Sequence, residues 1–102
     1  MKKRKLIKYQ DYLLNSLRDP NEAQAYLNAA LLEEDPRMFL LALKNVIDAQ
    51  KNSIVAVAQA TELKRESLRR MLSKKGNPRL TSVKSVLNAI DFDLAVLPAQ
   101  RR

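Results

Sequence analysis

The chain has 102 residues, a formal net charge of +8, and no His, Cys or Trp. This length allows one domain with a modest core, and without imidazoles and thiols the commonest metal ligands, general base and nucleophile are missing. We therefore expect no enzymatic activity, no metal site and no cofactor. No apolar run approaches the roughly 20 residues that cross a bilayer, and no apolar signal segment follows the basic start, so we expect a cytoplasmic protein with no membrane partner.

The positive charge is concentrated in two stretches of the sequence. Residues 1–8 carry five basic residues, and residues 64–84 carry eight against the single acid Glu66, a net charge of +7. Residues 9–50 hold seven acids and three basic residues, a net charge of −4. A basic block beside an acidic half is typical of a surface that binds a polyanion, although charge alone fits a solvated basic face equally well.

The first half of the chain is predicted to be helical. Residues 1–18 form either a basic arm or a short helix, and their pattern leaves both open. Asp19-Pro20-Asn21-Glu22 places an acid at the N-cap, proline at the first helical position and glutamate three residues after the cap, which predicts a helix start. Asp35-Pro36 repeats this chemistry for a second helix that ends near Gln50. Apolar residues recur at helical spacing in both segments.

Three more helices and one strand are predicted in the second half. Ser53 caps the first of these helices, the second covers about residues 64–73, and Thr81 caps the third. Gly76 lies where a left-handed residue would close the helix before it. Residues 92–96 alternate apolar and polar, which predicts a strand paired with the N-terminal arm or with the same strand of a second subunit. The domain would span residues 19–98, followed by a basic tail at 99–102.

Residues 53–73 match the spacing of a helix-turn-helix motif. Ala58 is the small residue that lets the helices cross, Leu63 is the apolar residue in the turn, and Leu68 and Met71 lie on the inner face of the second helix. Glu62 stands where glycine is favoured. If that turn is left-handed, the non-glycine residue costs on the order of 1 kcal/mol, which a packed core can absorb.

The second helix of this motif is expected to read DNA bases from its outer face. Arginine side chains can bind guanine and a carboxylate can accept from cytosine; the candidates are Arg65, Glu66, Arg69 and Arg70. For Glu66, a surface salt bridge to Arg70 is the alternative. Residues flanking this helix are candidates for phosphate contacts, namely Ser53, Lys64, Ser67, Ser73, Lys74, Lys75, Arg79, Thr81, Ser82 and, further along, Lys84. For Thr81 and Ser82, helix capping is compatible with that role.

Several short motifs together resemble a known family. The order AYLN at 25–28, Asp35-Pro36, RESL at 65–68 and GNP at 76–78 is similar to the addiction-module antidote family, small helix-turn-helix antitoxins of the Xre/HigA type, over residues 11–98. The resemblance implies a mostly α, five-helix, Xre/lambda-repressor-like domain with one short C-terminal β-strand. Departures are Glu62 for the usual glycine, Lys64 for the usual serine at the cap and Ile54 where related motifs carry glutamine.

The resemblance also implies a function and partners. The protein would be a bacterial type II antitoxin that binds a RelE/HigB-like ribonuclease toxin and, as a homodimer, double-stranded operator DNA. Two alternatives stay open from the residues: a toxin-binding module that uses DNA little, with the acidic stretch 11–35 facing a basic toxin, and a free-standing repressor with no toxin.

Overall fold

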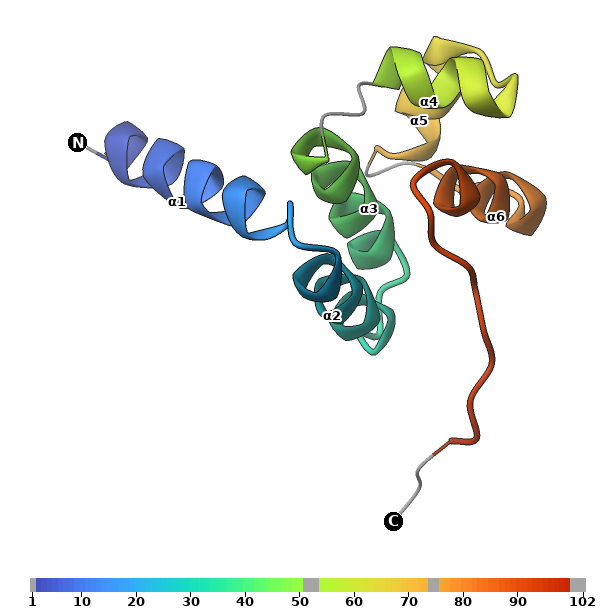
Figure 1. The fold of residues 1–102 in the computed structure, drawn as a ribbon, viewed down its shortest axis with the longest axis horizontal. Helices are drawn as coiled ribbons and strands as arrows, with labels where there is room; N and C mark the ends of the chain where they lie inside the picture. Colours follow the sequence, from blue (N-terminus) through green and yellow to red (C-terminus); the bar gives the residue numbers. More distant parts are fainter. Residues whose placement is uncertain (1, 51–53, 74–75, 100–102) are drawn as a thin grey trace.

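The protein is a bundle of short helices with one long arm. The computed structural model describes the backbone of residues 2–50, 54–73 and 76–99, and within these the side chains from residue 8 onward. These residues contain six helices and no strand. The helices are α1 (Lys2–Ser16), α2 (Pro20–Leu31), α3 (Arg37–Ala49), α4 (Ile54–Thr61), α5 (Arg65–Met71) and α6 (Leu80–Ala89). The α1 helix projects from the body, and the chain after α6 runs away as an extended tail (Figure 1).

The acid–proline pairs start two helices, as predicted, with one difference. Asp19 is the N-cap of α2, its Oδ1 accepts from the Asn21 N–H at 2.9 Å, and Pro20 is the first helical residue. Asp35 Oδ1 accepts from the Arg37 N–H in the same way at 2.9 Å, but α3 begins one residue later, after Pro36. The first turn there is closed by bonds between residues three apart, from Met38 N–H to the Asp35 carbonyl oxygen at 3.0 Å, for example.

Asp35 and Arg37 also form an exposed ion pair. The Arg37 guanidinium donates to the Asp35 carboxylate through Nε and Nη2 at 2.9–3.1 Å. Those side-chain bonds, and then the backbone bond from Arg37, hold the pKa of Asp35 below its usual value. This pair fixes the loop between α2 and α3.

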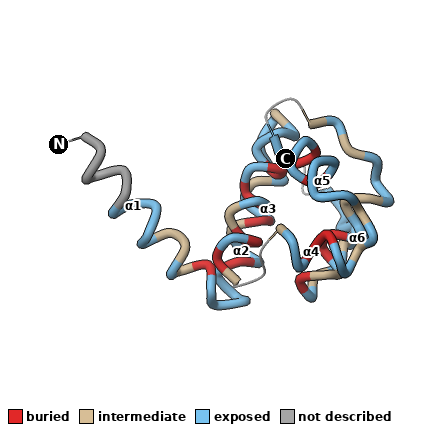
Figure 2. The backbone as a smooth tube through the Cα atoms, turned by 90° about the horizontal axis from the view of Figure 1, so that it is seen from above, coloured by how far each residue is buried: buried red, intermediate tan, exposed pale blue. Residues whose placement is uncertain are grey.

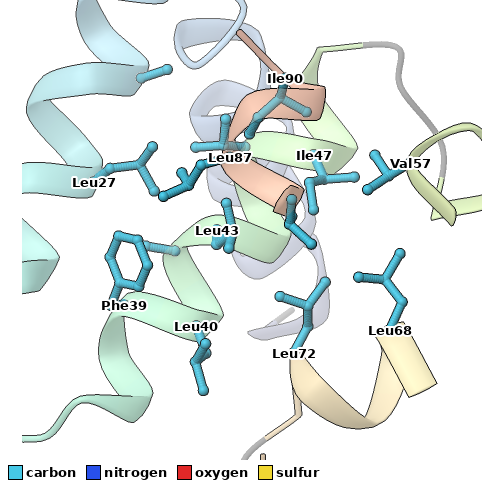
Figure 3. Close-up of a cluster of buried hydrophobic side chains, with 14 of the residues drawn as sticks. Leu27, Phe39, Leu40, Leu43, Ile47, Val57, Leu68, Leu72, Leu87 and Ile90 are labelled. Atoms are coloured by element: carbon cyan, nitrogen blue, oxygen red, sulfur yellow. The ribbon is translucent and has the colours of Figure 1, made fainter. Parts of the chain in front are cut away.

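The core is built around α3. Seven of its residues are buried, and Figure 2 shows buried positions along this helix, whereas residues 8–16 of α1 are exposed or intermediate. Leu43 and Ile47 of α3 face Leu68 and Leu72 across the core, with Leu87 from α6 beside them (Figure 3). No polar side chain is buried among the described residues. Because every packed face is apolar, burial alone holds α4, α5 and α6 against α3.

A chain of polar side chains joins the three N-terminal helices at the edge of this core. The Asn45 amide nitrogen of α3 donates to the Tyr26 hydroxyl of α2 at 3.0 Å, and the Gln10 amide nitrogen of α1 donates to Asn45 Oδ1 at 3.5 Å. Leu17, just after α1, is buried to 2% exposure. Of the two alternatives for the N-terminal segment, the described residues form a helix, α1 (Lys2–Ser16), whose C-terminal end is packed on the body.

Within the described part of a single chain, the predicted C-terminal strand does not form. Residues 92–99 have no strand partner in the described chain, and α6 ends in a turn at Asp91, whose φ is 67°. Phe92 and Leu94 are half-buried as the alternation predicts, but Val96 is 97% exposed. Alternation identified the inward side chains; it could not supply the neighbouring strand that a sheet requires.

The predicted N-cap role of Thr81 and the predicted left-handed conformation of Gly76 are wrong. Helix α6 begins at Leu80 with Arg79 as its N-cap, so Thr81 is already the second helical residue. The reason is that Arg79 takes an extended conformation and its carbonyl oxygen accepts the first bond, from the Val83 N–H at 3.1 Å. Gly76 has no positive φ and lies well after α5. A Cβ there would collide with the Met71 carbonyl group, so glycine is required by close approach and not by handedness.

Candidate nucleic-acid interface

A tight left-handed turn joins α4 to α5. Glu62 has φ 62°, which is the left-handed conformation considered for this position from the sequence. Thr61 supports the turn from the end of α4: its Oγ1 donates to the Val57 carbonyl oxygen at 2.8 Å and accepts from the Leu63 N–H at 3.4 Å. Leu63 packs against the core, and the chain then enters α5 through Lys64, which is extended and makes no side-chain cap.

Helix α5 has an apolar side and a cationic side. Leu68 and Met71, with Leu72 directly after the helix, are buried at 0%, 7% and 2% exposure, as their spacing predicts. The other side chains of the helix are exposed, namely Arg65, Glu66, Ser67, Arg69 and Arg70. The apolar side anchors the helix on α3 and α4, and this leaves the arginines facing solvent.

The arginines of α5 have no carboxylate partner. Within the described chain, the ion pairs are Arg37–Asp35 and Lys44–Asp48. Glu66 and Arg70 do not bond to each other, so the salt bridge considered as the alternative role for Glu66 does not form. Three unpaired guanidinium groups on seven residues produce a local positive field that attracts anions.

Four of the exposed side chains of α5, all except Glu66, line three hollows. The first, about 340 Å³, lies between α4 and the start of α5 and is lined by Gln59, Lys64 and Arg65, among others. The second, about 240 Å³, brings Ser67 and Arg70 of α5 together with Arg79 and Ser82 at the start of α6. The third, about 400 Å³, places Arg69 and Ser73 beside Leu41 and Lys44 of α3. Arg69 and Arg70 therefore face different neighbours, although a helical wheel groups them.

The remaining candidates include residues of α6 and residues whose structure is not described. Ser53, Lys74 and Lys75 lie outside the described residues. Thr81 and Lys84 are exposed on α6. The Ser73 hydroxyl donates to the Arg70 carbonyl oxygen at 2.7 Å, so its proton is engaged within the chain.

Two residues of this region were missed from the sequence. Thr61 holds the turn, and its signal is a threonine four residues after Val57, where its hydroxyl reaches the preceding turn of the helix. Gln59 is exposed on α4 in the same hollow as Arg65. The signal for Gln59 is a polar side chain on a helix whose other face is apolar.

Comparison with known proteins gives the family. A family model described as "Probable addiction module antidote protein" matches residues 7–98. The chain belongs to this antidote family. It is also 32% identical over 80 residues to an uncharacterized protein of Haemophilus influenzae, a match that covers 78% of this chain and 80% of that one. No solved structure matches the chain significantly.

The antidote family match covers α2 to α6, the part of α1 from residue 7 onward and most of the extended tail. An addiction-module antidote acts on a toxin, so membership supports an antitoxin role and implies a toxin partner. Among the described residues of this antidote, none of the helices has the length and apolar character needed to span a membrane. Its described side chains also include no cluster of acids that would hold a metal ion.

Proposed function

We propose that this antidote is the antitoxin of a bacterial type II toxin-antitoxin module. In this role α4 and α5 act as a helix-turn-helix of the Xre/HigA type. Two copies bind a palindromic operator and repress the operon, and the same protein neutralises a RelE/HigB-like toxin. The observation that carries the DNA-binding part is the outer face of α5, where three exposed arginines have no carboxylate partner among the described residues while the opposite face is buried.

The start of α5 is the part that reads bases. In a helix-turn-helix, the N-terminal residues of the second helix enter the major groove. Arg65 is the first residue of α5, and Glu66 follows it and forms no ion pair with any described residue. Arg65 can bind guanine O6 and N7, and Glu66 can accept from cytosine N4. In a dimer, the two copies of α5 would read half-sites roughly 34–36 Å apart, or a multiple of that.

The second hollow is suited to a phosphate. Ser67, Arg70, Arg79 and Ser82 converge there from two helices, and guanidinium and hydroxyl groups are common phosphate partners. Lys64 at the start of α5 and Lys84 on α6 are exposed and add positive charge. These contacts would supply affinity and salt dependence and would not distinguish sequences.

DNA binding is tested with the upstream region of the protein's own gene. Fluorescence anisotropy should show binding whose log affinity falls by about 0.9 per contacted phosphate for each log unit of salt. Arg65→Ala should lower the preference for that DNA over a scrambled duplex by about tenfold, equivalent to about 1.4 kcal/mol. Arg18→Ala is the control, because Arg18 is exposed between α1 and α2, on another part of the body. Equal loss in both variants, or none in Arg65→Ala, would refute the reading role of α5.

A toxin-binding module that uses DNA little is the second candidate. It is favoured by the exposed apolar and aromatic side chains around α1 and α2: Tyr9 is 65%, Tyr12 76% and Leu32 88% exposed. Acids of the stretch 11–35 lie among them, which suits a basic toxin. Co-expression separates the readings: the product of the neighbouring gene should arrest growth alone and be harmless with this protein. The second function replaces the first if the α5 variants neutralise the toxin fully and the unmodified protein binds no DNA.

A further inference from the structure

The tail after α6 is extended, apolar and uncovered. It leaves the body at Asp91 and runs along an open path (Figure 1). Leu94 packs against the core, whereas Val96 and Leu97 are 97% and 83% exposed. Two large apolar side chains in water beside each other are unfavourable unless another surface covers them.

The first residue of the tail uses both of its backbone groups on α6. The Phe92 N–H donates to the Leu87 carbonyl oxygen at 2.8 Å. With the Asn88 amide oriented so that its nitrogen donates, that nitrogen lies 2.8 Å from the Phe92 carbonyl oxygen and 2.7 Å from Asp93 Oδ1. Phe92 therefore directs its N–H and its carbonyl toward the body.

The direction of Phe92 determines which backbone groups point outward. In an extended chain, the N–H and carbonyl of one residue point to the same side, and those of the next point to the other. Leu94, Val96 and Pro98 then share the orientation of Phe92, while Asp93, Ala95 and Leu97 point away from α6. The structure gives no backbone hydrogen bond for residues 93–99. Pro98, which has no N–H, falls in the inward set, so the outward edge keeps every donor and acceptor.

We propose that a second copy of this chain covers that edge, by antiparallel pairing of residues 93–97 about a two-fold axis at Ala95. Each Asp93 then forms a hydrogen-bonded pair with Leu97 of the second copy, and the two Ala95 residues pair with each other. In an isologous contact the same surface of both copies forms the interface. When two copies of this edge run antiparallel, the outward N–H groups of each face the outward carbonyl oxygens of the other. The pairing deepens the proposed function by supplying the means of dimerisation.

The side chains on one face of the ladder, Leu94 and Val96, fit this register. In a pairing centred on Ala95, even-numbered residues lie opposite even-numbered residues of the other copy and share one face of the ladder. The apolar Leu94 and Val96 therefore lie on the same face. Val96 of each copy lies opposite Leu94 of the other, in a close non-hydrogen-bonded pair with about 4.5 Å between Cα atoms. Beside this pair of side chains lies a groove of about 500 Å³, which Leu94 lines together with Leu27 and Leu31 of α2. The exposed Val96 is thus covered by the body of the second copy.

The charges also fit. In this register the two Asp93 carboxylates are four residues apart along the ladder, about 14 Å. That exceeds the Debye length of about 8 Å at physiological salt, so their repulsion is screened. A register shifted toward Asp93 would bring them opposite each other, which is destabilising.

Cysteine cross-linking tests the register directly, because the chain has no cysteine of its own. In the proposed pair the Ala95 Cα atoms are about 5.5 Å apart, within the disulfide range of about 4.4–6.8 Å. Ala95→Cys should therefore form a covalent dimer on mild oxidation without DNA. Ala99→Cys is the matched control, since its two copies would be eight residues apart along the ladder, about 27 Å, and it should cross-link at least tenfold more slowly.

Sedimentation equilibrium gives the second, independent measurement. The unmodified protein should be a dimer at micromolar concentration. Ala95→Pro should raise the dissociation constant at least tenfold because it removes the central N–H groups, and Ala99→Pro should leave it unchanged. Circular dichroism should show unchanged helix content in both, since both positions lie in the exposed tail.

Each outcome decides one claim. A monomer at high micromolar concentration overturns this inference, as does a dimer that Ala95→Pro does not weaken or one in which Ala99→Cys links as fast as Ala95→Cys. Operator binding is measured separately. A cross-linked Ala95→Cys dimer that binds no DNA would refute the proposed DNA-binding function while leaving this pairing intact.

Discussion

Replacing Glu62 by glycine should stabilise the protein. Glu62 has φ 62°, its side chain is exposed, and it forms neither of the ion pairs of the described chain. A left-handed conformation costs an L-residue roughly 1–2 kcal/mol, and glycine avoids this cost. Glycine also has more freedom in the unfolded chain, which removes about 0.4–1 kcal/mol of the gain. We expect the free energy of unfolding of Glu62→Gly to exceed that of Glu62→Ala by about 1 kcal/mol. For a domain of this size, that difference raises Tm by about 4–8 °C.

The comparison with Glu62→Ala isolates the backbone. Both variants lose the carboxylate, so their difference reports the left-handed turn and not a charge effect. The measurement is urea denaturation followed by circular dichroism at 222 nm. Ala60→Gly is the control for glycine itself: Ala60 is exposed within α4, where glycine should cost about 0.5–1 kcal/mol. If Glu62→Gly is no more stable than Glu62→Ala, the turn between α4 and α5 is not strained and the argument is wrong.

Three further changes follow from the packing and the charges. Gly76→Ala should lower the free energy of unfolding by about 1–3 kcal/mol, because the new Cβ would lie 2.8 Å from the Met71 carbonyl carbon; an unchanged denaturation midpoint would contradict this. Leu68→Ala, at a fully buried position, should cost about 2–5 kcal/mol, and a loss under 1 kcal/mol would contradict close packing of α5. The pKa of Asp35 is lowered by its bonds from Arg37, so this pair stabilises the fold above the unfolded pKa of about 3.9 and the effect is lost as pH falls through the folded value. NMR titration should give a midpoint for Asp35 below its usual value that returns to normal in Arg37→Ala.

The sequence predicted helices where local chemistry decides the start or the buried face. Asp19 and Pro20 carry their own start signal, because a side-chain acceptor and a fixed φ act within one turn. Spacing alone predicted which side chains of the fourth predicted helix point into the core, namely Leu68, Met71 and Leu72. It could do so because helical geometry determines which residues share a face. Thr81 was misassigned because Arg79 starts α6 with its backbone and needs no side-chain cap.

Features that depend on another part of the molecule were not predictable. A strand at residues 92–96 needs a neighbour, and the described chain offers none. Arg69 and Arg70 are adjacent in sequence and share the outer arc of α5, yet one lies beside α3 and the other beside α6. That separation follows from how α5 docks on its neighbours, which helical spacing does not contain. Exposure of the α5 arginines was predictable, but their grouping into separate hollows was not.

The most direct test of DNA reading by α5 is a binding comparison across operator sequences. The upstream DNA of the protein's own gene is footprinted, and each protected base pair is substituted in turn. We expect one base pair in each half-site to contribute about 1–3 kcal/mol to the binding free energy of the unmodified protein and nothing to that of Arg65→Ala. Arg79→Ala should weaken binding to all sequences alike. If Arg65→Ala keeps the full sequence preference of the unmodified protein, α5 does not read the operator.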